Sequence, residues 1–183
     1  MIHPDTASML QESLPEYLRV ADWCVHFKKD ASWGPGQAGG RLGYPAALIL
    51  FSIADTIGSF HRGDQEFTVL VDGQATFIRR QGFQHFYVLN SDYYGLALPK
   101  AVIERLYANF RDLLVHNAAL APEHFLISLP DVAQAFLESD EGRLLVNIDG
   151  FLGITGPAVS LFLERLSTVV PGSAQEANIN KKR

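Results

Sequence analysis

The sequence contains a single cysteine, Cys24, in 183 residues. No disulfide can therefore form within the chain, which is typical of proteins from a reducing compartment. Because Cys24 lies among Trp23, Val25 and Phe27, we expect it to be a small core residue rather than a nucleophile.

The chain also lacks a strong positive charge and a long uninterrupted apolar run. Its formal net charge is −5, which argues against non-specific nucleic-acid binding but leaves room for a local basic cleft. The most apolar segment, residues 44–60, is interrupted by Asp55 and is shorter than the roughly 20 residues of a membrane span. The N-terminal residues resemble no secretory signal. These features predict a soluble, cytoplasmic protein with no membrane partner.

Metal and phosphate motifs are missing as well. The six histidines form no H-x-x-H or H-x-x-x-H pair, so the sequence predicts no metal site and no cofactor. The glycine-rich segment 32–43 contains no G-x-x-x-x-G-K-[ST] motif and follows no strand. We therefore expect it to be a flexible connection rather than a phosphate-binding loop.

Helical periodicity is the main signal that the sequence does contain. Pro15 either starts the first helix at a later residue or kinks it. The second helix opens near Pro45 and ends at His61 and Arg62, whose positive charges would suit the C-terminal dipole. The predicted helical segments are 6–30, 44–60, 82–90, 99–120 and 155–170. The polar end of the chain, from Pro171 onward, predicts a frayed tail.

Strand signals are few. The pair Asp72-Gly73 lies between two apolar stretches and predicts a small hairpin. Residues 125–129 and 144–148 are each typical of a strand, with a short helix or turn between them at 131–138. The sequence therefore predicts a mainly α fold, a small up-and-down helical bundle. Residues 124–149 would form a short two-stranded β insertion, for which a hairpin is one arrangement. One domain would span residues 1–170, followed by a flexible tail at 171–183.

The helix predicted at 99–120 carries the most suggestive polar residues. At about 100° per residue, its apolar side chains form one broad stripe, with Asn117 near it. Arg111 and His116 lie on the two borders of the face that this stripe leaves free. Asp112 and His116 are four residues apart, so the carboxylate is placed to contact the imidazole. The helix dipole alone would also favour an arginine and a histidine near a C-terminus.

The segment 106–117, with Arg111, Asp112 and His116 in an R-x-x-x-x-H pattern, resembles the signature helix of the HEPN domains (higher eukaryotes and prokaryotes nucleotide-binding). The apolar helix 44–60, with Ser52 and Asp55, is similar to another helix of such bundles. The resemblance implies a homodimeric, metal-independent endoribonuclease of a toxin–antitoxin or phage-defence system, with an antitoxin protein as a further possible partner.

In the roles that this resemblance implies, His116 acts as general acid or base on the ribose 2′-OH or the leaving 5′-oxygen. Arg111 stabilises charge on the phosphoryl oxygens and Asp112 orients His116. Some HEPN domains have no nuclease activity, so the alternative is a non-catalytic module that binds a nucleotide or a protein partner.

Other polar residues have two interpretations each. Asp55 either pairs with an arginine, which we favour, or borders the cleft as a substrate-binding group. Arg105 is a further candidate for substrate binding, because an RNA-cleaving site needs local positive charge. Tyr93 and Tyr94 either stack on bases or, as we expect, pack at the edge of the core.

Overall fold

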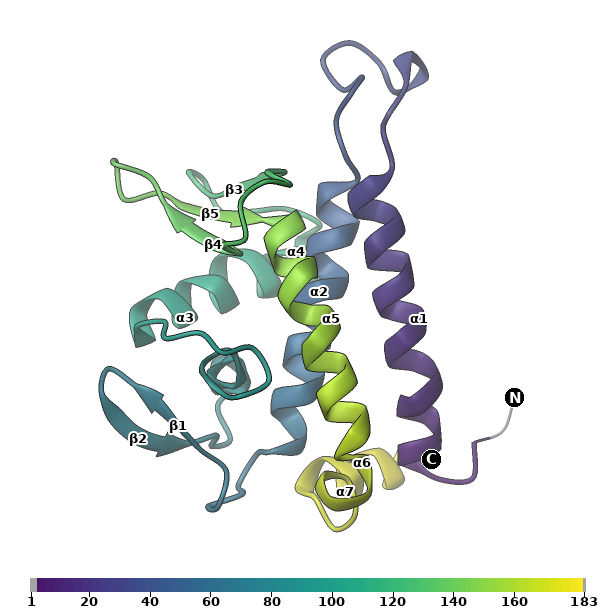
Figure 1. Cartoon of the computed structure of the whole chain (residues 1–183), viewed down its shortest axis with the longest axis vertical. Helices are drawn as coiled ribbons and strands as arrows, with labels where there is room; N and C mark the ends of the chain where they lie inside the picture. Colours follow the sequence, from purple (N-terminus) through teal and green to yellow (C-terminus); the bar gives the residue numbers. More distant parts are fainter. Residues whose placement is uncertain (1–2, 183) are drawn as a thin grey trace.

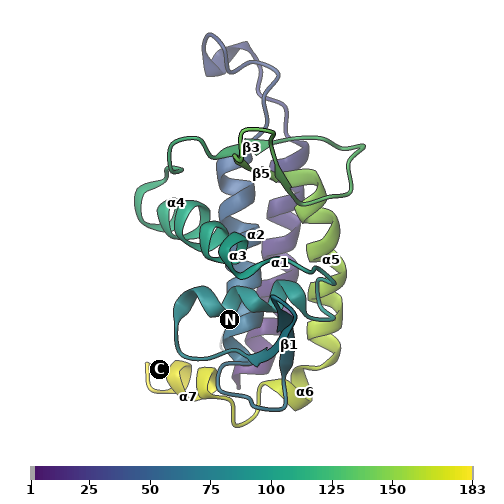
Figure 2. The same ribbon diagram turned by 90° about the vertical axis from the view of Figure 1, so that its left-hand side faces the viewer.

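The computed structural model of the chain describes residues 3–182, and it is mainly α as predicted (Figure 1). Helices α1 (Thr6–His26), α2 (Gly43–Phe60) and α5 (Ile148–Glu164) lie side by side. The helix formed by α3 (Lys100–Leu106) and α4 (Leu113–Asn117) crosses them (Figure 2). Because α2 and α5 run in the same direction (Figure 1), the long helices do not alternate as in a simple up-and-down bundle.

Helix α1 is longer at its start than the proline suggested. It begins at Thr6, where the carboxylate of Asp5 accepts a hydrogen bond of 2.7 Å from the backbone N–H of Ser8 and caps the helix. Pro15 lies inside the helix on its exposed side, so the helix starts where the periodicity of residues 6–30 begins, and the alternative of a later start at the proline was wrong.

The glycine-rich segment forms an arm that projects beyond the ends of α1 and α2 (Figure 1). Two backbone hydrogen bonds join its sides: Lys29 N–H to the Gly40 carbonyl at 2.9 Å and Gly39 N–H to the Lys29 carbonyl at 2.7 Å. A short 3₁₀ turn, Ala31–Trp33, lies near the tip. The arm is thus a connection, as predicted, but a hydrogen-bonded one.

Helix α2 is the central element of the core. Phe51 is fully buried and contacts Phe86, Phe110, Phe136 and Phe151, with ring centroids 5.0 to 6.4 Å away. These rings come from four other segments, so burial of one side chain ties most of the fold together. By length and composition α2 could cross a membrane, but 56% of it is buried inside the protein, as in the core helix of a soluble protein.

The predicted hairpin is confirmed. Strand β1 (Thr68–Val71) pairs antiparallel with β2 (Gln74–Phe77). The two turn residues, Asp72 and Gly73, have φ angles of 51° and 75°, which is the geometry that an Asp-Gly pair favours in a two-residue turn. A 3₁₀ helix, η2 (Gly82–Asn90), follows where a short helix was expected.

The insertion in residues 124–149 differs from the prediction, because it has three strands. Strand β5 (Leu144–Asn147) lies between β3 (Phe125–Ile127) and β4 (Phe136–Glu138), parallel to β3 and antiparallel to β4. The two predicted strands therefore pair in parallel and form no hairpin, and β4 replaces part of the predicted helix or turn. Asn147, fully buried, stabilises this arrangement: its side chain hydrogen-bonds backbone groups of residues 129–134.

The predicted frayed tail also has structure. After α6 (Leu166–Val169), helix α7 (Ala174–Asn180) begins with Ser173, whose hydroxyl accepts a hydrogen bond from Glu176 N–H at 3.1 Å. Ile179 packs against the core, and α7 contacts α2. The serine cap and this apolar contact both stabilise a helix in a segment whose composition is polar.

The buried residues settle three of the open interpretations. Cys24 is buried and its pKa is raised by burial, so it is a core residue as expected. Tyr93 and Tyr94 are buried as well, which confirms core-edge packing. His61, however, is only 4% exposed, and its ring stacks on Phe67 with centroids 3.7 Å apart. Burial lowers the pKa of His61 to about 4, so its predicted role as a positive charge at the helix end is wrong.

We expect His61 to make the protein less stable as the pH falls from about 6.5 to about 4. Burial and Arg165 lower the pKa of His61, and Asp64 and Asp92 offset them only in part. Between these pH values the imidazole is protonated in the unfolded chain but stays neutral in the folded chain. The free energy of unfolding therefore decreases by about 1.4 kcal/mol for each pH unit by which the pH falls. Urea unfolding of wild type and His61→Gln across this range checks the expectation. An equally steep decline in the variant would contradict it.

Candidate functional site

The segment that carries Arg111 and Asp112 is not α-helical. Residues Tyr107–Asp112 form a π-helical segment, η3, between α3 and α4. Its hydrogen bonds run from residue i to i+5, so the turn is wider than in an α-helix and the faces after it are shifted. Asn117, expected near the core, is consequently exposed. Turns of this kind occur frequently at functional sites.

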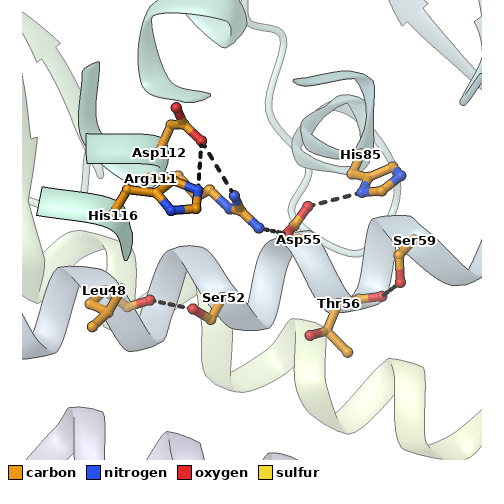
Figure 3. A network of polar contacts seen from close by, with 9 residues as sticks. All are labelled: Leu48, Ser52, Asp55, Thr56, Ser59, His85, Arg111, Asp112 and His116. Carbon is orange, nitrogen blue, oxygen red and sulfur yellow. Dashed lines mark hydrogen bonds and ion pairs between the residues drawn. The ribbon is translucent and has the colours of Figure 1, made fainter. Parts of the chain in front are cut away.

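Three polar side chains of the R-x-x-x-x-H segment meet at one carboxylate oxygen. The carboxylate oxygen Oδ1 of Asp112 lies 3.5 Å from Nε2 of His116 and 3.7 Å from Nη1 of Arg111 (Figure 3). The contact between Asp112 and His116 was predicted; the shared oxygen was not. The side chain of His116 is 64% exposed, so its imidazole is accessible to a ligand.

Asp55 of α2 lies beneath this group and uses both of its oxygens. Oδ2 accepts a hydrogen bond of 2.6 Å from Arg111, and Oδ1 lies 2.9 Å from Nδ1 of His85 (Figure 3). The favoured interpretation, pairing with an arginine, is confirmed. Burial would raise the pKa of Asp55, but the hydrogen bond from His85 and the charge of Arg111 outweigh it and hold the pKa below its usual value.

Asp55 therefore positions Arg111, whereas its predicted role in binding substrate stays a prediction. Its side chain is 18% exposed and that of Arg111 is 21% exposed. With one contact on each oxygen, this carboxylate is held mainly by Arg111 and His85.

His85 is the member of this cluster that sequence inspection missed. It lies on η2, and the backbone of η2 reaches α2 only because residue 58 is a glycine: an added Cβ at Gly58 would lie 2.0 Å from the carbonyl oxygen of His85. Gly58 follows Asp55 by three residues on α2, so this close approach places His85 beside the carboxylate. A glycine inside an apolar helix was the available signal, because such a position often marks a close contact.

Two buried nitrogen atoms of the cluster have no hydrogen-bond partner among residues 3–182. They are Nε2 of His85 and Nε of Arg111. The hydroxyls of Ser52 and Ser59 do not compensate, because they donate to backbone carbonyls of their own helix, Leu48 and Thr56 (Figure 3).

Arg105 is not brought into the cluster. Its guanidinium donates to Oε1 of Glu138 at 3.1 Å and to the carbonyl of Gly142 at 2.9 Å. It therefore ties α3 to strand β4 and the turn that follows, and its predicted role in binding substrate stays a prediction. Over the described part of the chain, no group of three or more His, Cys, Asp or Glu side chains is placed to hold a metal ion.

Comparison with known proteins returns nothing: no family model, no curated protein and no solved structure matches this chain. The HEPN assignment thus stays a prediction that rests on residues of the π-helical segment and α4. The site itself offers an accessible imidazole, a carboxylate that contacts it and a fixed guanidinium. Those groups suit proton transfer next to a phosphate.

Proposed function

We propose that the protein is a cytoplasmic, metal-independent endoribonuclease of HEPN type, which acts as a homodimer in a toxin–antitoxin or defence system. The observation that carries the proposal is the shared contact of Arg111 and His116 with Asp112 Oδ1 at an accessible surface. In the reaction, the ribose 2′-oxygen attacks the adjacent phosphorus and the bond from phosphorus to the 5′-oxygen breaks. The products are a 2′,3′-cyclic phosphate and a free 5′-hydroxyl.

Each reacting group has a role in this scheme. Asp112 keeps the imidazole of His116 oriented for proton transfer. Asp55 holds Arg111 through one nitrogen, Nη2, and leaves Nη1 at 3.7 Å from Asp112, longer than a hydrogen bond and available to a phosphoryl oxygen.

The proposal of a homodimer has a chemical reason. The 2′-hydroxyl must lose a proton and the 5′-oxygen must gain one, which is most direct with two acid–base groups on opposite sides of the phosphate. One chain offers a single accessible imidazole here, since His85 is mostly buried. A second copy across a two-fold axis would supply the other His116.

The test is cleavage of single-stranded RNA in the presence of EDTA. We expect wild type to cleave and to leave 2′,3′-cyclic phosphate ends, and His116→Ala to lower the rate by about 10² to 10⁴. His26→Ala is a matched control, because His26 forms the same i,i+4 contact with Asp22, at 3.2 Å, and is 65% exposed. Its rate should equal that of wild type. Undiminished cleavage by His116→Ala would remove the proposed mechanism.

One observation favours a second candidate, a non-catalytic module that binds a nucleotide or a protein such as an antitoxin. The charge of Arg111 is offset by two carboxylates, Asp55 and Asp112, so the site has little excess positive charge to attract RNA. This candidate predicts that purified wild type cleaves no RNA, and that His116→Ala and Asp112→Ala weaken partner binding instead.

A further inference from the structure

A second surface, away from Arg111 and His116, concentrates positive charge. A pocket of about 560 Å³ lies where the glycine-rich arm meets the start of α2 and strand β3. Lys28, Lys29 and Arg41 line it, together with Tyr44 and Ser128, and no aspartate or glutamate is among its lining residues. In a chain with a net charge of −5, three cations in one pocket stand out against the charge of the whole protein.

None of these cations is neutralised by a carboxylate of residues 3–182. Arg41 donates to the carbonyl of His26 at 2.8 Å, and Lys29 Nζ lies 3.4 Å from the amide oxygen of Gln37. Both acceptors are uncharged, so the positive potential remains. The acid Asp149, in the first turn of α5, accepts a hydrogen bond of 2.7 Å from Ser128 but is not among the residues that line the pocket. Cations that line one pocket and form no ion pair there are stabilised by a bound anion.

The start of α2 adds to this potential. Gly43 and Tyr44 line the pocket, and the 18-residue helix that begins there has no side-chain cap. Its first N–H groups and the positive end of its dipole therefore favour an anion at the same place. Tyr44, which is exposed, presents an aromatic face on which a base can stack.

The pocket and the candidate site lie on one face of α2. Tyr44 and Asp55 are eleven residues apart, which places them about 20° apart around the helix and about 16 Å apart along its axis. Leu48 and Ser52, both partly exposed, lie between them, and Figure 3 shows His116 over this stretch. A strand of nucleic acid whose scissile phosphate is at His116 would pass along this face to the pocket.

We propose that the pocket binds a backbone phosphate of single-stranded RNA, as a second phosphate subsite of the proposed ribonuclease. Lys28, Lys29 and Arg41 neutralise the phosphate and Tyr44 stacks on an adjoining base. The substrate is then an unpaired strand several nucleotides long rather than a dinucleotide, because the two phosphate positions are separated along α2. This inference rests on the proposed function for the identity of the ligand.

The test measures binding, without cleavage, of a fluorescent single-stranded 2′-O-methyl oligoribonucleotide, in which the attacking hydroxyl is blocked. Changing Lys28, Lys29 and Arg41 together to glutamine should weaken the Kd at least about tenfold, and the slope of log Kd against log salt should fall by about 0.7 for each phosphate that the variant no longer neutralises. A control with the same net charge changes Arg19, Lys181 and Lys182 to glutamine; these residues are exposed and line no part of the pocket. It should bind like wild type.

The outcomes separate this inference from the proposed function. In a His116→Ala background, the pocket variant should still bind more weakly than its control, so loss of cleavage with pocket-dependent binding leaves the subsite standing. Equal binding by the pocket variant and its control, or no binding by wild type, would overturn the subsite even if the protein cleaves RNA. Binding of inorganic phosphate that depends on the pocket cations, together with oligonucleotide binding that does not, would also overturn it, since the pocket would then be a site for a small free anion.

Discussion

Replacement of Gly58 by alanine is expected to destabilise the protein by about 3 kcal/mol or more, although alanine is the better helix former by about 1 kcal/mol. The Cβ atom would lie 2.0 Å from the carbonyl oxygen, 2.7 Å from the carbonyl carbon and 3.0 Å from the Cα of His85. All three are backbone atoms, so no side-chain rotation can relieve the clash. Helix η2 would have to move away from α2, and His85 would lose Asp55.

Gly153→Ala is the matched control. Gly153 is also inside a helix, α5, but an added Cβ there would meet nothing within 4 Å. We expect it to leave stability unchanged or to raise it by up to about 1 kcal/mol. Urea unfolding at neutral pH measures both variants. If Gly58→Ala were as stable as Gly153→Ala, the close approach of η2 to α2 would not be what places His85.

The elements that could be predicted from the sequence have local causes. Pro45 and Pro99 mark the starts of helices because proline fits the first turn, and the apolar spacing that follows extends them. Asp72-Gly73 predicts a hairpin because both residues tolerate positive φ. These signals need no knowledge of distant residues, and the structure has an element in each place.

The elements that were missed depend on contacts far apart in sequence. Strand β4 forms because β5 offers an edge to pair with, which overrides the weak turn signals of residues 131–138. Helix α7 has a local serine cap, but it is held against the protein through Ile179 and its contact with α2. No local sequence pattern indicates that β4 would pair with β5 or that α7 would pack against α2.

The candidate site shows the same division. The contact between Asp112 and His116 follows from i,i+4 spacing, and the structure has it. The position of Arg111 around the helix could not be derived by assuming 100° per residue. The π-helical segment that contains Arg111 changes the angle between successive residues. His85 could not be paired with Asp55 from spacing at all, since 30 residues separate them.

The second large expected effect on stability comes from Asp55, whose negative charge holds Arg111 in place. We expect Asp55→Asn to destabilise the protein by about 2 to 3 kcal/mol at neutral pH, somewhat less than for a fully buried ion pair. The substitution preserves volume but leaves the guanidinium of Arg111, 21% exposed, without its closest carboxylate. Arg111→Gln should cost a similar amount, and the double variant should cost less than both single costs combined, with a coupling energy of about 2 kcal/mol.

The control is an exposed pair of the same charges. Lys100 and Glu104 lie 3.7 Å apart with side chains 50% and 46% exposed, so the coupling between Lys100→Gln and Glu104→Gln should be about 0.5 kcal/mol. The pH dependence supplies a second measurement. The folded pKa of Asp55 is below its unfolded value, so the ion pair stabilises the protein above about pH 4, and this contribution is lost as the pH falls further.

The gap in stability between wild type and Asp55→Asn should accordingly stay constant from neutral pH down to about pH 5 and narrow below about pH 4. The size of the coupling between Asp55 and Arg111 also bears on function, because an arginine held by about 2 kcal/mol meets a phosphate with less loss of side-chain freedom at that moment. A coupling no larger than that of Lys100 and Glu104 would mean that Asp55 does not hold Arg111 in place. The role of Asp55 as a positioning residue would then have to be abandoned.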